Sequence, residues 1–385
     1  MTQRIAFAGT RGVPANYGGF ETAVDEITRR FVAAGYECDV FCRLSHSGEQ
    51  LDTHEGRRLI YVKGASQAWL ETFASAFQTG WYLLRHRRRY DHVFWFNNAN
   101  FPGIMLTLLA GIPLTVNTDG LEWRRKKWSW PFKAYYMATS WFISRIVPRL
   151  VSDSFGIQEF YRKVFWRKTM MIPYGIPRRV EVSPEEQAEI LRNYGLQSGK
   201  YFLQITRFEP DNLPLEIAKG FLESGLGERG YQYVAVGYRG DSPYALALHE
   251  LSGRGGGVRV LPAVYDPKVL FTLRTNCFAY AHGNSVGGTN PALLEAMSTC
   301  PRILAIDVPF SREVMAGAGL YFKPEDIAAA FRCIIAQESQ QEAFAARVDW
   351  YNWDDVALAY IAILHGEQAL YRQPTNLFRT PEAFR

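Results

Sequence analysis

The sequence predicts an α/β protein made of two doubly wound domains, each with a parallel β-sheet between helices. Short β-rich runs alternate with amphipathic stretches along the chain, which is typical of a parallel sheet flanked by helices. The alternation stops at a segment rich in turn formers, residues 172–179, and then begins again. With 385 residues, 48% of them hydrophobic, the chain is long enough for two separate cores.

The first domain is expected over residues 1–176, with its first strand near the N-terminus. Helical patterns separate most of its strands, so consecutive strands should run parallel. The expected strands cover residues 4–9, 37–43, 59–63, 92–97, 113–117, 150–153 and 169–172. The expected helices cover residues 21–34, 68–87, 102–110, 131–146 and 156–165.

The second domain is expected over residues 177–354. A helix from Trp353 to Arg372, in the C-terminal stretch of about 355–385, should pack back onto the first domain across the hinge. Ligands of doubly wound domains bind at the carboxyl ends of the strands, so we expect the two domains to face a central cleft. The expected strands of this domain cover residues 201–206, 231–236, 258–261, 277–281, 302–306 and 320–322.

Composition narrows the class of protein. A net charge of +5 is modest for this length and does not indicate nucleic acid as a partner. The five cysteines lack the close pairs of a zinc site and fit a reduced, cytoplasmic compartment. The N-terminal apolar run has only the length of a strand, unlike a signal peptide. The longest apolar stretch, residues 101–116, is too short for a membrane span and contains Pro and Gly.

A glycine-rich loop follows the first strand and leads into the first helix. Such loops allow backbone N–H groups to approach a ligand, and a helix N-terminus favours anions. The paired glycines Gly18 and Gly19 at the helix entry are therefore candidate donor-binding residues. The spacing from Gly9 to Gly12 does not match a dinucleotide fingerprint, and the second strand ends in Arg43 instead of an acid, which disfavours an oxidoreductase. A long turn without a ligand is the alternative.

A second strand, glycine-rich loop and helix occupy residues 282–297. Thr289 or Asn290 can cap this helix and Pro291 suits its first position, which would leave N–H groups free for a diphosphate. Glu295 lies one turn into the helix, where it is either a ligand contact or an ordinary solvated glutamate. The candidate donor contacts in the loop are His282, Asn284, Gly287, Gly288, Thr289 and Asn290.

At these motifs the chain resembles glycosyltransferase family 4, whose fold is GT-B. The resemblance is carried by Thr206-Arg-Phe-Glu-Pro-Asp-Asn212, by Gly287-Gly-Thr-Asn-Pro-Ala-Leu-Leu-Glu-Ala-Met297 and by the final helix with Trp353. A branch of bacterial rhamnosyltransferases of cell-surface polysaccharide synthesis is most similar. Two longer runs point to that branch: Thr10-Arg-Gly-Val-Pro-Ala-Asn-Tyr-Gly-Gly-Phe-Glu21 and Asn117-Thr-Asp-Gly-Leu-Glu-Trp-Arg-Arg125.

The resemblance implies roles for individual residues. Glu295 should hold the nucleotide ribose, and the loop and helix start at residues 286–291 should hold the diphosphate. Arg207 should neutralise it, because a guanidinium matches phosphate oxygens and keeps its charge. The sequence departs from the family at Gly287, which replaces a glutamate that contacts the donor sugar, and at Asn212, which replaces a basic residue.

The segment at residues 117–122 ends a strand of the first domain and is the candidate acceptor site. A carboxylate there can orient or deprotonate an acceptor hydroxyl, or stabilise an oxocarbenium ion. Asp119 is the first candidate and Glu122 the second, and the alternative is an Asp-Gly turn. Asn97 and Asn98 end another strand and could bind sugar hydroxyls, or they could form a turn.

A basic and aromatic run follows at residues 123–130. Basic side chains mixed with tryptophans suit an anionic lipid surface, because the charges meet head groups while indole rings settle at the interface. A second basic run at residues 85–89 could lie on the same side, and a solvated charged face is the alternative. The candidate residues are Trp123, Arg124, Arg125, Lys126, Lys127, Trp128 and Trp130.

Taken with the resemblance, the sequence predicts a retaining, metal-independent glycosyltransferase without a cofactor, peripheral at the inner face of the cell membrane. The expected donor is dTDP-rhamnose and the expected acceptor is a lipid-linked saccharide of surface polysaccharide synthesis. Nucleic acid is not an expected partner. A catalytically inactive nucleotide-sugar-binding or scaffold protein is the main alternative, and an oxidoreductase or a nucleotide-sugar epimerase are more distant ones.

Overall fold

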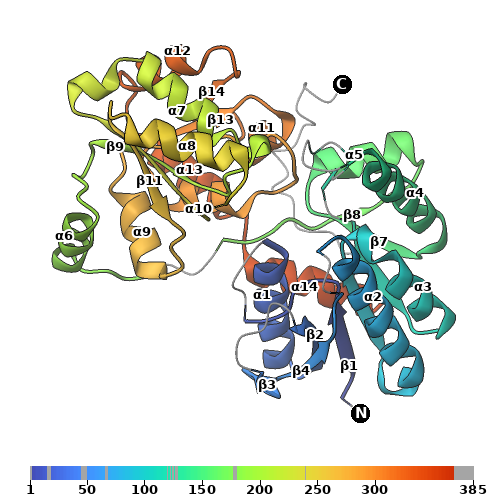
Figure 1. Ribbon diagram of the computed structural model, residues 1–385. Coiled ribbons are helices and arrows are strands. Elements are labelled where there is room, and N and C mark those ends of the chain that lie inside the picture. The colour runs from blue at the N-terminus through green and yellow to red at the C-terminus, as the bar shows by residue number, and fades with distance from the viewer. Residues whose placement is uncertain are drawn as a thin grey trace. The chain divides into compact units, whose positions relative to one another are not determined.

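The computed structural model describes residues 2–14, 19–44, 50–65, 68–118, 120–121, 123, 125, 129–176, 180–238 and 240–367. The chain divides into two compact units, each with a largely parallel sheet and helices packed on it (Figure 1). Unit 1 comprises residues 1–124, 128–175 and 351–373. Unit 2 comprises residues 125–127, 176–350 and 374–385.

The sheet of unit 1 has the strand order β3-β4-β2-β1-β5-β6-β7-β8. All its pairings are parallel except that of the short strand β3, which forms an antiparallel hairpin with β4 and was not predicted. The other strands confirm the expected elements to within a few residues at each end. The strands are β1 Arg4–Ala8, β2 Glu37–Arg43, β3 Thr53–His54, β4 Arg57–Val62, β5 His92–Phe96, β6 Leu114–Asn117, β7 Arg149–Ser152 and β8 Met170–Met171.

Among the helices of unit 1, α1 packs on α14 and α2 packs on α3. The second pair approaches so closely that a Cβ atom on Gly80 would lie 2.8 Å from the Cα atom of Gly103. None of the helices in the described residues is long and apolar enough to cross a membrane. The helices are α1 Gly19–Ala33, α2 Ala68–Arg85, η2 Arg87–Arg89, η3 Asn98–Asn100, α3 Phe101–Leu109, α4 Trp130–Ile146, α5 Phe155–Val164 and α14 Trp353–Leu364.

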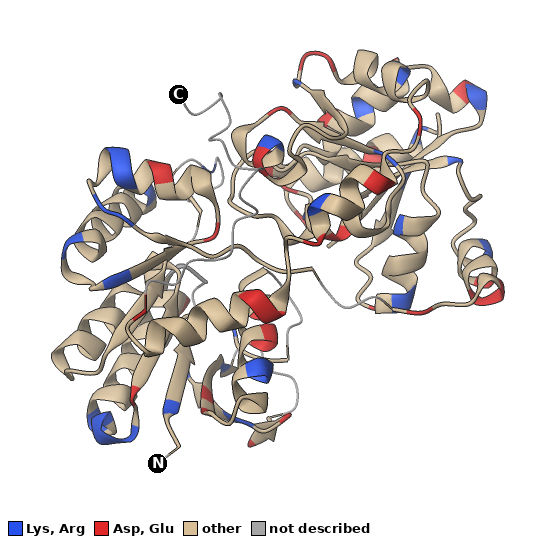
Figure 2. Ribbon diagram, turned by 180° about the vertical axis from the view of Figure 1, so that it is seen from behind, with Lys and Arg blue, Asp and Glu red and all other residues tan. Residues whose placement is uncertain are grey.

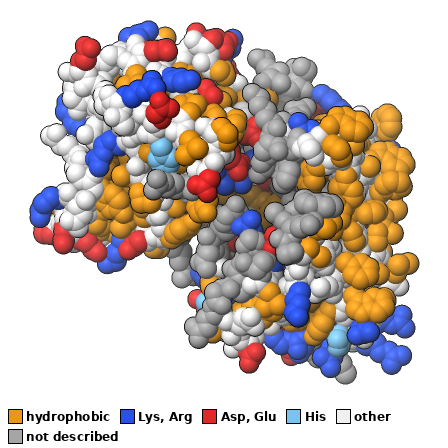
Figure 3. Space-filling view, in the orientation of Figure 1, with side chains coloured by type: hydrophobic (Ala, Val, Ile, Leu, Met, Phe, Trp, Pro, Cys, Tyr) orange, Lys and Arg blue, Asp and Glu red, His pale blue; other side chains and the backbone are white. Residues whose placement is uncertain are grey.

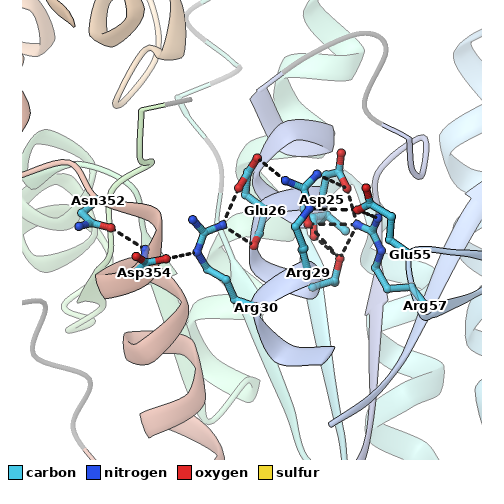
Figure 4. Close-up of polar contacts among 10 residues, drawn as sticks. Asp25, Glu26, Arg29, Arg30, Glu55, Arg57, Asn352 and Asp354 are labelled. Atoms are coloured by element: carbon cyan, nitrogen blue, oxygen red, sulfur yellow. Dashed lines mark hydrogen bonds and ion pairs between the residues drawn. The ribbon is translucent and has the colours of Figure 1, made fainter. Parts of the chain in front are cut away.

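The C-terminal helix α14 is shorter than expected. It ends at Leu364 and not at Arg372, because Gly366 adopts a positive φ of 74°, a conformation that commonly terminates a helix. One ion pair connects its first turn to α1: Arg30 of α1 donates to Asp354 at 2.5 Å, and it also pairs with Glu26 of its own helix at 2.5 Å (Figure 4). The position of α14 on unit 1 therefore rests on a charged contact at its start and on apolar packing along its length.

The sheet of unit 2 has the order β11-β10-β9-β12-β13-β14, and all pairings are parallel. Its strands agree with the predicted ones and are β9 Tyr201–Ile205, β10 Gln232–Gly237, β11 Val258–Pro262, β12 Ala279–His282, β13 Ile303–Ile306 and β14 Leu320–Phe322. Its helices are α6 Pro184–Asn193, η5 Pro210–Asn212, α7 Pro214–Glu223, η6 Leu226–Arg229, α8 Pro243–Gly253, α9 Pro267–Thr275, α10 Pro291–Thr299, α11 Pro309–Met315, α12 Ile327–Ile334 and α13 Gln341–Val348.

The core of unit 2 is centred on three phenylalanines from different elements. Phe202 on β9 makes edge contacts with Phe331 on α12 and packs near Phe221 on α7, at ring-centre distances of 4.9 and 6.0 Å. All three rings are fully buried. Burial of one such side chain stabilises a fold by about 1.5–3 kcal/mol. This core holds β9 in the middle of the sheet, next to the place where the strand order reverses.

Candidate functional site

The strand order of unit 2 reverses between β9 and β12. The helix after β9 connects toward β10, whereas the helix after β12 connects toward β13, so the two loops diverge at the carboxyl edge of the sheet. Ligands of open α/β sheets bind in the crevice that such a switch point creates. Here the switch point is flanked by residues 206–213, which follow β9, and residues 283–290, which follow β12.

The two loops are joined by hydrogen bonds. Ser285 donates from both its backbone N–H and its hydroxyl to the carbonyl oxygen of Asp211, each at 2.9 Å. Gly283 sits against the other loop, since a Cβ atom there would come within 2.3 Å of the carbonyl oxygen of Asn212. The two backbones are therefore in close contact at the switch point, and a side chain larger than that of glycine at residue 283 would meet the other loop.

Arg207 is the basic side chain of the first loop. Its side chain is 39% exposed, and its guanidinium lies 3.8 Å from the Glu209 carboxylate. Asn212 holds the backbone of Arg207 by a hydrogen bond. The side-chain amide of Asn212 donates to the carbonyl oxygen of Arg207 at 2.9 Å, and the backbone carbonyl of Asn212 accepts from Gln204 at 2.9 Å. Asn212 is almost completely buried. In this chain the position therefore has a structural role, and a charged lysine would have no route to solvent from it.

The second loop leads into the N-terminus of α10. Asn290 caps this helix by accepting a hydrogen bond from the N–H of Ala292 at 3.0 Å, and Pro291 occupies the first turn. Thr289, the other expected cap, is buried. Gly287 has a φ of 156°, which residues other than glycine rarely adopt, and the space beside it is open. Pro291 has no N–H group, and the N–H groups of Ala292, Leu293 and Leu294 all bond to Asn290. The N–H groups expected to be free at the first turn of α10 are therefore already used, and the start of the helix presents the positive end of its dipole beside an open loop.

Glu295 lies one turn into α10 and forms an ion pair with Arg274, which comes from α9. Arg274 is almost completely buried, whereas about a quarter of the Glu295 side chain is exposed. The buried arginine thus holds the carboxylate and leaves part of it accessible. Arg274 was not predicted from the sequence, because nothing in the local pattern of α9 distinguishes it from an ordinary basic residue in the last turn of a helix.

His282 and Asn284 were the other expected sugar contacts. His282 ends β12 and is buried, and this burial lowers the pKa of its imidazole to about 3. The ring is therefore neutral near pH 7 and is available for hydrogen bonds but not as a cation. Asn284 and Gly288 are half-buried positions of the same loop.

Unit 1 has its own switch point, between β1 and β5. Gly9 directly follows β1 and lies against β5, since a Cβ atom there would lie 2.2 Å from the carbonyl oxygen of Phe96. The Asn100 amide bridges the two strands by donating to Gly9 at 3.0 Å and to Phe96 at 2.8 Å. Gly19 is the first residue of α1. A small pocket beside this point has as its polar lining residues Thr10, Arg43, Ser75, Thr79 and Asn100.

Two expected acceptor or membrane residues have other roles. Asn98 is completely buried, and its amide donates to Ser140 at 2.9 Å and to Tyr161 at 2.7 Å, so it is not available to a sugar. Trp123 is half-buried and packs against Tyr136 and Phe160 of unit 1, at ring-centre distances of 5.7 and 5.2 Å. The long-range contacts that bury Asn98 and pack Trp123 on α4 and α5 have no signature in the sequence.

Of the other expected residues, some are at least partly exposed and the rest lie outside the described residues. Asn97 is half-buried at a positive φ of 75°, and its side chain accepts from the N–H of Ala99 at 2.8 Å, as a turn former does. Trp130 starts α4 and is highly exposed, and Arg125 is half-buried. Several expected residues lie outside the described residues, namely Gly18, Asp119, Glu122, Arg124, Lys126, Lys127 and Trp128.

Within the described ranges, one group of side chains has the spacing of a metal site: Asp25, His54 and Glu55, whose ligand atoms lie within 4.8 Å of one another. Both carboxylates are already bound by arginines. The fully buried Arg57 pairs with Asp25 and with Glu55, and Arg29 donates to Glu55 at 3.0 Å (Figure 4). The group is better described as an ion-pair network that joins α1 to the β3-β4 hairpin.

Comparison with known proteins agrees with this architecture. Residues 106–177 match the model of a domain of unknown function, DUF1972. No curated protein sequence matches the chain. Among solved structures, sucrose-phosphate synthase from Thermosynechococcus elongatus is similar with a TM-score of 0.74 and 17% identity, over 94% of this chain and 98% of that one.

Two further structures are similar over nearly their whole length. A glycosyltransferase from Rickettsia africae has a TM-score of 0.70 and 15% identity, over 95% of this chain and 98% of that one. The trehalose-6-phosphate structure from E. coli with bound UDP-2-fluoro glucose has a TM-score of 0.68 and 11% identity, over 94% and 99%. The chain therefore has the GT-B fold, with two Rossmann-like units, as the sequence predicted.

Proposed function

We propose that this protein is a glycosyltransferase that moves a sugar from a nucleotide-sugar donor to an acceptor. The observation that carries the proposal is the switch point of unit 2, since Arg207, the N-terminus of α10 and the carboxylate of Glu295 all follow the two strands that meet there. The similarity to a glycosyltransferase and to a structure with a bound nucleotide sugar supports it.

The diphosphate of the donor would lie at the start of α10. Its negative charge is complementary to the helix dipole and to Arg207. These groups would stabilise the diphosphate both when bound and when it leaves as the nucleotide, so the proposed reaction needs no metal ion. The residues assigned to this function are Arg207, Gly287, Gly288, Thr289 and Asn290.

Glu295 would bind the ribose of the nucleotide. A carboxylate accepts hydrogen bonds from sugar hydroxyls, and Arg274 positions it for this contact through their ion pair. A contact to the 3′-hydroxyl alone would suffice, which is compatible with a deoxyribonucleotide donor such as dTDP-rhamnose. His282 and Asn284 would contact the sugar in place of the glutamate that the family has at Gly287, and Gly18 and Gly19 would complete the donor site.

In the reaction the bond between the anomeric carbon and the diphosphate oxygen breaks, and a bond to an acceptor oxygen forms. The acceptor hydroxyl loses its proton, and the nucleoside diphosphate leaves with the electron pair. We assign Asp119 first and Glu122 second to orient or deprotonate that hydroxyl, with Arg207 stabilising the leaving group. From the family resemblance we propose that the anomeric configuration is retained.

We further propose L-rhamnose from dTDP-rhamnose as the transferred sugar and a lipid-linked glycan of surface polysaccharide synthesis as the acceptor. This assignment rests on the two long motifs at residues 10–21 and 117–125. An acceptor of this kind lies at the inner face of the cell membrane. Asn97 and the basic and aromatic residues 124–130 are the candidates to meet the acceptor or the membrane.

The test is nucleotide release from a panel of donors. Purified protein is incubated with dTDP-rhamnose, UDP-GlcNAc, UDP-glucose or GDP-mannose, with and without membranes that carry lipid-linked GlcNAc, in the presence of EDTA. Acceptor-dependent release from one donor would establish a transferase and identify its sugar. An absolute need for a divalent metal would contradict the proposed stabilisation of the diphosphate.

A second candidate function is a nucleotide-sugar-binding or scaffold protein without catalysis. The observation in its favour is Gly287, because the family's donor-sugar carboxylate is missing at this position. Such a protein would bind a donor in calorimetry but release no nucleotide under any condition of the panel. Turnover of the donor without any acceptor would instead indicate an epimerase.

A further inference from the structure

The charge and the tryptophans of this chain are unevenly distributed. Residues 68–168 hold 15 Lys and Arg but only 6 Asp and Glu, a net charge of +9, although the whole chain has a net charge of +5. The same residues include eight of the 10 tryptophans. This stretch contains α2, α3, α4 and α5 of unit 1. This stretch is therefore rich in both cationic and aromatic side chains, whereas the rest of the chain is net acidic.

On α2 these side chains form an exposed stripe. Phe77, Trp81 and Arg85 are four residues apart and lie on one face of the helix. The rings of Phe77 and Trp81 are parallel, and the guanidinium of Arg85 lies 5.0 Å above the Trp81 ring. Phe77 is 52% exposed and Trp81 is 42% exposed, although both are large apolar side chains. The stripe continues into η2, whose three arginines are exposed.

A second exposed group lies at the end of α4. Arg145 contacts the ring of Trp141 at 5.6 Å and the ring of Trp166 at 6.0 Å, so Trp166, which follows α5, joins this group. Trp141 is 44% exposed and Trp166 is 78% exposed. Phe142 and Ile146 beside them are exposed as well. In each group the aromatic rings are exposed to solvent and contact a guanidinium, and they are not buried under other parts of unit 1.

Helix α3 connects the two groups. It packs on α2 at the Gly80–Gly103 contact, and its Phe101 ring lies 6.2 Å from Phe142 on α4. It contains no charged residue, and its last residue, Leu109, is exposed. Figure 3 shows hydrophobic side chains gathered over the side of unit 1 that carries α2, α3 and α4, and Figure 2 marks Lys and Arg at helix ends.

We propose that this surface docks unit 1 onto an anionic phospholipid bilayer. We call it the aromatic-basic face. It consists of Phe77, Trp81, Leu109, Trp141, Phe142, Ile146 and Trp166 with Arg85, Arg87, Arg88, Arg89 and Arg145.

The chemistry of the face fits a lipid surface. Indole rings favour the region between head groups and acyl chains, and each arginine near an anionic surface adds to the attraction. Cation–π contacts keep the guanidinium groups beside the rings, where head-group phosphates would meet them. The one glutamate of α5, Glu159, is neutralised by Arg162 at 2.6 Å and Lys163 at 3.1 Å, so it would not repel an anionic surface.

A second copy of the chain is a poorer occupant of this face. In a two-fold dimer the same patch meets itself, and the arginines of one copy would face those of the other. Like charges brought together in this way repel, whereas anionic head groups would neutralise them. The charge of the face therefore selects a lipid surface over self-association.

This inference deepens the proposed function, because a lipid-linked acceptor is confined to the membrane plane. It differs from the expectation drawn from residues 123–130, since it assigns docking to the outer face of α2, α3 and α4. It can also be tested without catalysis, since lipid binding is measured separately from donor turnover.

The apolar part of the face is tested with a triple variant, W81S/W141S/W166S. Binding is measured by flotation with vesicles of phosphatidylcholine containing 30% phosphatidylglycerol, and with phosphatidylcholine alone. The wild type should float with the anionic vesicles, and the triple variant should bind them at least tenfold more weakly. The matched control is Y238S/Y265S, which removes two exposed rings of unit 2 and should float like the wild type.

The charged part is tested with R87E/R88E/R89E, against R229E/R254E/R332E as an equal charge change on exposed arginines of unit 2. The η2 variant should lose at least tenfold in binding to anionic vesicles, and the unit 2 variant should bind like the wild type. Circular dichroism verifies that each variant is folded. Quenching of tryptophan fluorescence by brominated lipids should occur in the wild type and be reduced in W81S/W141S/W166S.

Other outcomes would overturn the proposal. Equal binding to neutral and anionic vesicles, or no flotation of the wild type, would show that the face does not dock on an anionic bilayer. A dimer in sedimentation that W81S/W141S/W166S abolishes, without vesicle binding, would assign the face to a second copy. Nucleotide release with detergent-dispersed acceptor measures the proposed transferase activity without a bilayer. Loss of vesicle binding therefore does not imply loss of transferase activity, and failure of transfer does not imply loss of vesicle binding.

Discussion

Arg274 on α9 holds the carboxylate of Glu295 on α10, a residue 21 positions later in the chain. The arginine is almost buried and the glutamate is partly exposed, so the pair orients an accessible carboxylate from within the protein. A glutamate on a helix surface would sample many rotamers. Its confinement at the switch point of unit 2 suggests a binding role more strongly than its sequence position alone.

Glu295→Gln should weaken donor binding by about 10- to 100-fold, because a hydrogen bond to a charged group contributes about 1.5–3 kcal/mol. Isothermal calorimetry with the donor identified by the panel measures this. Arg274→Met should weaken binding in the same direction by releasing the carboxylate. If Glu295 binds the donor only when Arg274 holds it, the double variant should lose less than the sum of the two single effects. Full additivity would contradict the coupling.

Arg207→Ala should lower kcat/KM by about 100- to 1000-fold, the loss expected when a group that stabilises developing charge is removed. Arg207→Lys should recover part of the activity, because a lysine keeps the charge but not the paired geometry of a guanidinium. Arg254→Ala is the matched control, since Arg254 is an exposed arginine at the end of α8. Steady-state nucleotide release gives the comparison, and an unchanged kcat/KM in Arg207→Ala would remove Arg207 from the site.

Gly283→Ala should destabilise unit 2 by about 1–3 kcal/mol, because the new methyl group would meet the backbone carbonyl of Asn212, which cannot rotate away. Gly253→Ala is the control. This glycine is helical with open space around it, so alanine should stabilise α8 by up to about 1 kcal/mol. Urea unfolding followed by circular dichroism measures both, and equal stability of the two variants would argue against a tight contact between the loops.

Trp353→Ala should destabilise unit 1 by about 3–5 kcal/mol, because Trp353 is buried against Gly175 and Tyr174. Asp354→Asn removes the ion pair to Arg30, whose acidic partner is largely exposed, and should lose only about 0.2–1 kcal/mol. Thermal unfolding of the two variants separates these contributions. A larger effect of Asp354→Asn would mean that charge and not packing holds α14.

Acid should destabilise both units between pH 6.5 and pH 3 through buried histidines. Burial lowers the pKa of His282 in unit 2 to about 3, and burial with the charge of Arg149 lowers that of His92 in unit 1 to about 3. The unfolded chain binds a proton below its pKa of about 6.5 while the folded protein does not. Stability is therefore complete above pH 6.5 and decreases as the pH falls toward 3.

At pH 5 each histidine should lower the stability of its unit by about 1–2 kcal/mol relative to pH 7.5. Urea unfolding at the two pH values measures the loss. His282→Gln should reduce the pH dependence of unit 2 and His92→Gln that of unit 1. An unchanged pH dependence in both variants would show that other groups cause it.

Much of the site followed from local patterns. The glycine-rich run after β12, the Asn290-Pro291 start of α10 and the position of Glu295 were all predictable, because caps, turns and periodicity depend on neighbours in the sequence. The ion-pair partner of Glu295, Arg274, was not predictable from local patterns. Nor was the burial of Asn98 by Ser140 and Tyr161, because these contacts join helices whose mutual packing is set by the sheet.

The sequence by itself determined the α/β class, the strands of both sheets apart from β3, and the two loops that follow β9 and β12 at the carboxyl edge of unit 2. Alternating patterns and turn residues encode these features locally. Only the tertiary structure decided which side chains meet. It placed Arg274 under Glu295, buried Asn212 beneath Arg207 and left the aromatic rings of α2 and α4 exposed, because these outcomes depend on how helices distant in the chain pack on a common sheet.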